Sequence, residues 1–123
     1  MGKLFYANTD AAVEIDDTLL AHLQVVTSTK LRRSESFTLT MRRSSVPSAG
    51  RETLWLQPSI PLRFQFDSAE PVRLDPALLR SLADMANSSA GLTVDLDSAA
   101  AELPARVAPS RARRAQPALS RVA

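Results

Sequence analysis

The sequence contains no cysteine, only three glycines and a single histidine. Without cysteine, the chain has no disulfide and no thiolate that could bind a metal ion or act as a nucleophile. The glycines are scattered, so no glycine-rich loop is present to hold a phosphate, and His22 has no second histidine with which to share a metal ion. These absences exclude zinc-finger, redox, P-loop and dinucleotide-binding proteins, and we expect no cofactor.

Long apolar runs are missing as well. No apolar segment approaches the roughly 18 to 20 residues that a membrane-spanning helix needs. The N-terminal string MGKLFYANTD also lacks the apolar stretch of a signal peptide. We therefore expect a cytoplasmic protein without a membrane partner.

The positive charge of the chain is concentrated near its C-terminus. Residues 1–97 hold ten basic and twelve acidic side chains, a net charge of −2, whereas residues 98–123 hold five arginines and one glutamate, a net charge of +4. The second segment is rich in alanine, arginine and proline, and it has too few apolar side chains to offset the entropy lost on ordering. We predict one domain over residues 1–97 and a disordered basic tail over residues 98–123.

Hydrophobic periodicity predicts two helices in the domain. Residues 16–33 repeat leucine and valine at helical spacing, with Asp16 or Asp17 as the N-cap and cations in the last turn. A second helix begins at Asp75 and Pro76, an N-cap followed by a proline at the first helical position.

Alternating apolar and polar residues predict short strands around these helices. The strands are expected at residues 4–7, 13–16, 37–41, 53–57, 62–67 and 92–96. The resulting order ββαβββαβ, with short links between the central strands, predicts an α+β fold. We expect two layers, with a mostly antiparallel sheet of five to six strands and both helices on one face.

Trp55 is the candidate functional residue that the strand pattern singles out. If the leucines and phenylalanines of the strands face the helices, alternation places Trp55 on the opposite, polar face of the sheet. The predicted interaction face comprises Trp55, Gln57, Arg63, Gln65, Thr38 and Thr40. An exposed tryptophan on a rigid sheet is a typical contact for a partner protein, and beside arginines it can stack a base. Alternatively, the first strand, the loop at 42–51 or the tail covers Trp55, or Pro58 and Pro61 invert the register.

Three other polar groups have both a structural and a functional interpretation. His22 lies at the edge of the apolar stripe of the first helix, and we interpret it as partly buried or partner-facing rather than catalytic. Asp95 and Asp97 could hold a hard cation, but we favour carboxylates on the solvent side of a strand. The string RRSS at 42–45 resembles a site for a basic-directed kinase, and its arginines are equally explained as residues that flank a loop.

The tail offers a separate hypothesis of weak, nonspecific nucleic-acid binding, because arginines neutralise phosphates regardless of base sequence. The candidate contacts are Arg106, Arg111, Arg113 and Arg114.

Several strings resemble, in the same order, a family of short bacterial proteins of unknown function. They are MGKLFY, IDDTLLAHLQVV, KLRRSESF, LWLQPSIPLRFQF and MANSSAGL. The resemblance spans roughly residues 1–96, and members of the family often carry the label "ATP-dependent DNA ligase". Ligation of that kind needs a lysine nucleophile in a K-x-D-G setting. Lys3 precedes LFY and Lys30 precedes LRR, so we do not expect this chain to ligate DNA.

We therefore predict a non-catalytic interaction module that binds a protein partner or a second copy of itself through the face around Trp55. The alternative is a nucleic-acid-associated accessory protein, and a small enzyme of unknown reaction comes third. Salt separates the first two, since phosphate binding weakens steeply with salt and a protein interface centred on a tryptophan does not.

Overall fold

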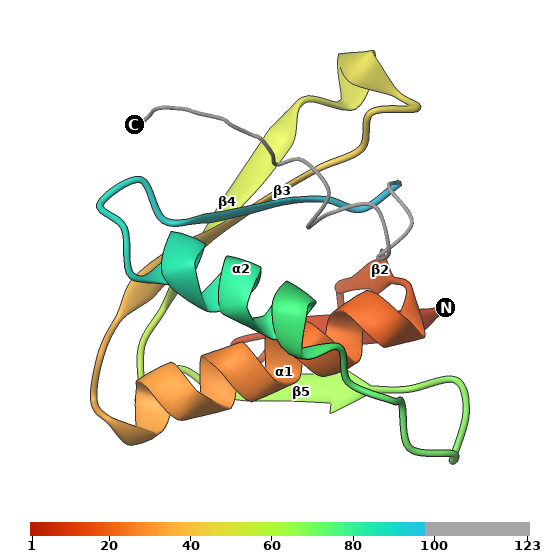
Figure 1. The fold of residues 1–123 in the computed structure, drawn as a ribbon. Coiled ribbons are helices and arrows are strands. Elements are labelled where there is room, and N and C mark those ends of the chain that lie inside the picture. The colour runs from red at the N-terminus through yellow and green to blue at the C-terminus, as the bar shows by residue number, and fades with distance from the viewer. Residues whose placement is uncertain (98–123) are drawn as a thin grey trace.

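The computed structural model describes residues 1–97 and contains two helices and six strands (Figure 1). The elements are β1 (Gly2–Tyr6), β2 (Ala12–Ile15), α1 (Asp17–Arg32), β3 (Phe37–Arg42), a 3-10 turn (Pro47–Ala49), β4 (Arg51–Leu56), β5 (Leu62–Gln65), α2 (Pro76–Ala86) and β6 (Leu92–Asp95). The predicted α+β class and element order are confirmed. The predictions for the tail, including the contacts at Arg106, Arg111, Arg113 and Arg114, lie outside the described residues.

The strands form two three-stranded sheets where the sequence pattern suggested one. The first sheet has the order β2-β1-β5 and the second β4-β3-β6. All pairings are antiparallel except that of β3 with β6. Pro58 and Pro61 lie between β4 and β5, and because proline has no N–H it cannot extend a ladder of hydrogen bonds. The chain leaves the second sheet there and enters the first.

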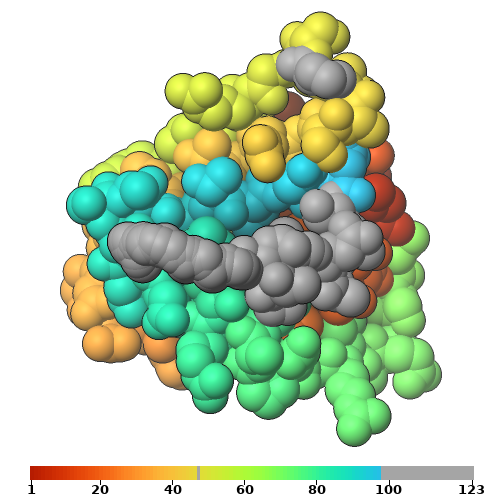
Figure 2. All heavy atoms as spheres, turned by 45° about the horizontal axis from the view of Figure 1, so that its top comes forward, coloured from red at the N-terminus to blue at the C-terminus, as the bar shows by residue number. Residues whose placement is uncertain are grey.

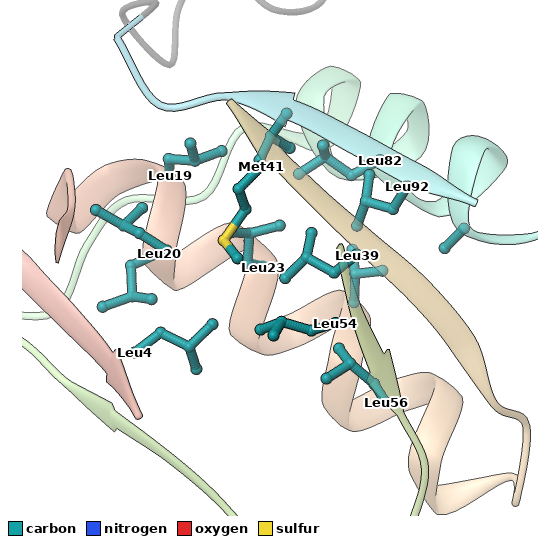
Figure 3. Packing of buried hydrophobic residues seen from close by; sticks show 14 of the residues in the cluster. Leu4, Leu19, Leu20, Leu23, Leu39, Met41, Leu54, Leu56, Leu82 and Leu92 are labelled. Atoms are coloured by element: carbon teal, nitrogen blue, oxygen red, sulfur yellow. The ribbon is translucent and has the colours of Figure 1, made fainter. Parts of the chain in front are cut away.

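Apolar side chains from both sheets and both helices meet in one core. Leu20 and Leu23 of α1 are completely buried, and in Figure 3 Leu23 lies between Leu4 of β1 and Leu39 of β3. Leu82 of α2 covers the inner side of the second sheet near β6. Burial of each such leucine contributes about 2 kcal/mol to folding. The core therefore holds the two sheets in a fixed relation through α1.

Two aspartates at the start of α1 have different roles. The carboxylate of Asp16 accepts hydrogen bonds from two backbone N–H groups of the first turn, at 3.0 and 3.4 Å, and is the N-cap. Asp17 instead accepts from the backbone N–H groups of Asp67 and Ser68, at 3.1 and 3.2 Å. The cap that the sequence left open between these two residues thus belongs to Asp16, while Asp17 fixes the segment after β5.

His22 is completely buried and links the two helices. Its Nδ1 lies 2.6 Å from the carbonyl oxygen of Thr18, and its Nε2 lies 2.8 Å from the backbone nitrogen of Asp75, the N-cap of α2. Because a carbonyl only accepts and a backbone N–H only donates, the proton is on Nδ1 and Nε2 is the acceptor. Of the roles predicted for His22, the structure supports the buried one.

Candidate interaction face

The outer side of the second sheet carries a row of side chains from each of its strands. Apart from the exposed Glu52, the alternate residues of β3 and β4 and the leucine and valine of β6 are buried in the core, so the remaining positions point away from it. These positions are Thr38, Thr40, Arg42, Arg51, Thr53, Trp55, Thr93 and Asp95. We call this set the Trp55 face.

Trp55 is the dominant side chain of this face, with 52% of its surface exposed. Hydrogen bonds to β1 and to β3 fix the strand that carries it. The hydroxyl of Tyr6 donates a hydrogen bond to the carbonyl oxygen of Trp55 at 2.7 Å, which ties β4 to the end of β1. The hydroxyls of Thr40 and Thr53 lie 2.8 Å apart across the β3–β4 pair. Trp55 therefore lies exposed on a fixed backbone, as the alternation of the strand predicts.

The structure brings only part of the predicted interaction face together. Thr38 lies directly opposite Trp55, and Thr40 is two residues further along β3. Arg63 and Gln65 lie on β5 in the first sheet, so their predicted place beside Trp55 is wrong. The reason is the pairing of β5 with β1 instead of with β4.

Arg63 and Gln57 each have a partner close by. The guanidinium of Arg63 lies 3.9 Å from the centre of the Phe5 ring, which faces it on β1. Gln57 follows the end of β4, and its amide donates to the hydroxyl of Ser59 at 2.7 Å. Arg63 therefore packs within the first sheet, and the Gln57 side chain is bonded to the turn that follows β4.

Two arginines of the Trp55 face were missing from the predicted set. Arg42 and Arg51 lie opposite each other where the β3–β4 pair ends, although like charges at such positions destabilise a sheet. Arg42 lies 4.0 Å from the carboxylate of Asp95, whereas within residues 1–97 Arg51 forms no ion pair. Arg51, Thr53 and Trp55 are spaced two residues apart, and this alternation in the sequence would have placed Arg51 on the same face as Trp55.

A pocket of about 250 Å³ opens beside Trp55, between the ends of the two helices. Lys30, from the last turns of α1, is nearly buried in its wall. The ammonium of Lys30 donates to the side-chain oxygen of Asn87 at 2.8 Å and lies 3.2 Å from the carboxylate of Glu35. Its charge is therefore used to hold the end of α2 against the end of α1.

Gly91 lies in the same pocket and allows β6 to approach β3. Its φ of 82° is in the left-handed region, and a Cβ there would overlap the hydroxyl of Thr38. Gly91→Ala is expected to lower the free energy of unfolding by about 2 kcal/mol, measured by urea denaturation. Gly50 is the matched control, because its φ is 73° but a Cβ would have nothing within 4 Å. Equal losses in the two variants would contradict the overlap with Thr38.

Asp95 and Asp97 bind the segment that follows β3. Asp95 accepts from the backbone N–H of Ser44 at 3.2 Å, and Asp97 accepts from the N–H and the hydroxyl of Ser45 at 2.8 and 2.6 Å. The guanidinium of Arg43 lies 3.4 Å from Asp97. In Figure 2 the end of β6 (blue) lies against this segment (yellow). We call these five residues the β6 clamp.

The β6 clamp favours the structural interpretation of the two aspartates over a cation site. The described residues contain no group of three histidine, aspartate or glutamate side chains that could hold a metal ion. Modification of the serines at 42–45 by a basic-directed kinase stays a prediction.

The carboxyl groups of the β6 clamp have lowered pKa values. Hydrogen bonds from Ser45 lower the pKa of Asp97. For Asp95, desolvation is the largest single effect and raises the pKa, but hydrogen bonds from Asp97 and Ser44 together with the charge of Arg42 outweigh it. Both groups therefore stabilise the fold in their ionised form.

The lowered pKa values predict a stability that is lost in acid. The contribution is complete above the pKa of an unfolded aspartate, about 3.9, and disappears as the pH falls through the lower folded pKa values. We expect Asp97→Asn to lower the melting temperature at neutral pH, with a difference from the wild type that shrinks below about pH 4. Melting curves from neutral to acid pH test this, with Asp10→Asn, in an exposed turn, as the control. A difference that is constant with pH would contradict the role of Asp97.

The fold and this face define a small α+β domain with an open, tryptophan-bearing sheet. The chain belongs to the family described as "Domain of unknown function (DUF7882)", whose family model matches residues 1–97. No curated protein and no solved structure matches the chain. Among residues 1–97, neither helix is long and apolar enough to span a membrane. The resemblance to an uncharacterised family is therefore confirmed, and it assigns no activity.

Proposed function

We propose that the domain is a non-catalytic interaction module that binds a protein partner through the Trp55 face. The observation that carries this proposal is the exposure of Trp55 on a backbone held by Tyr6 and by the β3–β4 pair. Tryptophan is enriched among the residues that dominate binding energy, and a preorganised strand loses little entropy on binding. The surrounding threonine hydroxyls supply the polar rim that such an anchor needs.

The chemistry of the Trp55 face supports binding over catalysis. The hydroxyls of Thr40 and Thr53 are hydrogen-bonded to each other, and no base lies beside them among the described residues to activate either one. Asp95, the one carboxylate of the face, accepts hydrogen bonds from backbone N–H groups. A nucleophile, a base and an orienting group do not come together here.

Replacement of Trp55 tests the proposal. We expect Trp55→Ala to fold with nearly unchanged stability, because the side chain is half exposed and lies outside the core. The full chain would be immobilised as the wild type, as Trp55→Ala and as Arg63→Ala, and proteins retained from native extract would be identified by mass spectrometry. A partner should be retained by the wild type and Arg63→Ala and lost from Trp55→Ala. Equal retention by all three chains would refute the proposal.

Nucleic acid is the second candidate partner, and the position of Arg42 and Arg51 on the same face as Trp55 favours it. Trp55 is the only tryptophan, so its fluorescence reports directly on a stacked base. With a protein interface, oligothymidylate should leave the emission unchanged at low salt. Quenching that weakens with salt and is lost in Arg51→Ala would instead favour nucleic acid.

A further inference from the structure

The outer edge of β4 is the feature from which we draw a further inference. β4 lies at one end of the second sheet and spans six residues. The other edge strands among the described residues, β2, β5 and β6, span four residues each. β4 is thus the longest strand with one side unpaired, and its side chains include Trp55.

One hydrogen bond fixes the direction of the backbone groups in β3. The N–H of Leu96 donates to the carbonyl oxygen of Arg42 at 2.8 Å, so the backbone of Arg42 is directed toward β6. Successive residues of a strand direct their backbone groups to opposite sides. Leu39 and Met41 therefore direct theirs toward β4.

The same alternation identifies the backbone groups that β4 leaves open. Leu54 and Glu52 lie opposite the β3 residues that face β4, so they complete the ladder. The residues whose backbone groups point away from β3 are Arg51, Thr53 and Trp55. The hydrogen bond from Tyr6 to the carbonyl of Trp55 is independent evidence for this direction.

Most of these outward groups have no partner in the part of the chain that the structure describes. Tyr6 occupies the carbonyl of Trp55, but no other hydrogen bond reaches the outward groups of Arg51 and Thr53 or the N–H of Trp55. A row of open donors and acceptors on a strand edge pairs readily with a further strand. The edge therefore fits an extended segment of protein.

β4 is complementary to a second copy of itself. In an antiparallel pair with its two-fold axis at Thr53, the threonines exchange hydrogen bonds, and the N–H of Trp55 donates to the carbonyl of Arg51 of the partner subunit. The remaining bond of that pair, from the N–H of Arg51 of the partner subunit to the carbonyl of Trp55, would share an oxygen that already accepts from Tyr6 and has a second lone pair. On the outer face, each Trp55 then lies opposite an arginine of the other copy.

Charge supports a second copy as the occupant. Within one chain, Arg51 faces the like-charged Arg42 and, in residues 1–97, has no ion pair. Pairing of two β4 strands places its guanidinium beside an indole, an arrangement that attracts a cation to the ring face. The edge thus supplies the hydrogen bonds and the Trp55 face supplies matching side chains.

We infer that the chain forms a homodimer in which the β4 strands of two copies pair antiparallel around Thr53. This inference rests on the proposed interaction role, and it names the partner as a second copy of this chain. The dimer joins the second sheets of the two copies into one continuous sheet.

Proline substitution at the two edges of the second sheet tests the inference. Thr53 and Thr93 are exposed residues on β4 and β6 whose N–H groups point away from β3, so both sites should tolerate proline in the fold. Light scattering coupled to size exclusion would measure the mass of the full chain over a series of concentrations. We expect the wild type and Thr93→Pro to form dimers that dissociate on dilution. Thr53→Pro should be monomeric throughout, with a native circular dichroism spectrum.

Arg51→Glu gives a second test that keeps every backbone N–H. It should raise the dissociation constant of the dimer about tenfold, because the partner's tryptophan loses its cation. A monomeric wild type, or Thr53→Pro or Arg51→Glu chains that dimerise as tightly as the wild type, would overturn the edge pairing. These results leave the proposed function standing, because that proposal is tested separately by the partners that the wild type retains and Trp55→Ala loses.

Discussion

Leu23→Asp is expected to leave the domain unfolded. Leu23 has no exposed surface and lies at the centre of α1, where it faces Leu39 and Met41 of the second sheet (Figure 3). A carboxylate at this position would have no cation and no hydrogen-bond donor around it, a cost of several kcal/mol. Since small domains are stable by only about 5 to 15 kcal/mol, this loss is comparable to the whole stability.

Circular dichroism and thermal unfolding would measure the effect of Leu23→Asp. Gln24→Asp is the matched control, because Gln24 is the next residue of the same helix and is exposed. The control should melt close to the wild type. A cooperatively folded Leu23→Asp chain would mean that α1 turns another face to the core.

His22→Leu is expected to destabilise the domain by about 3 kcal/mol. Leucine resembles histidine in size, but it cannot accept the hydrogen bond from the backbone N–H of Asp75. That group is then left without its acceptor at the point where α2 begins, and the bond to Thr18 is also lost. The effect therefore comes from unmatched polar groups, since the volume of the core is kept.

Urea denaturation would measure the loss in His22→Leu. His22→Gln should recover part of the stability, because its side-chain oxygen can accept a hydrogen bond from the same N–H. A His22→Leu chain as stable as the wild type would show that water or another group satisfies Asp75.

The helices and the inward faces of the strands could be predicted because both follow from local periodicity. Leu23 and Leu82 lie in the core as the helical stripes require. The pairing of the strands could not be predicted, because alternation defines which side of a strand is buried and not which strand lies next to it. β5 pairs with β1, although residues 3–6 and 62–65 are far apart in the sequence. Only Pro58 and Pro61 indicated that the sheet breaks after β4.

The same difference between burial and strand pairing explains which parts of the candidate site could be predicted. The exposure of Trp55 could be predicted because Leu54 and Leu56, its neighbours on either side, are both core residues. The place of Arg63 depends on strand pairing and was wrong. Arg51 was missed because the start of β4 was placed at residue 53, whereas the strand begins at Arg51. The contacts of the β6 clamp could not be predicted, because its two aspartates are far in the sequence from the serines that they bind.

The β6 clamp also defines where a reporter or fusion partner can be attached. Residues 95 to 97 are held by Arg43 and by the backbone of Ser44 and Ser45, and Arg43 in turn donates to the carbonyl oxygen of Glu14 at 2.7 Å. A chain shortened to end at Asp97 contains every residue of these interactions. A chain shortened to end at Val94 lacks both carboxylates. A fluorophore or a second protein joined directly after Asp97 would therefore leave the domain beside β2 at a fixed point, which suits distance measurements across the proposed dimer.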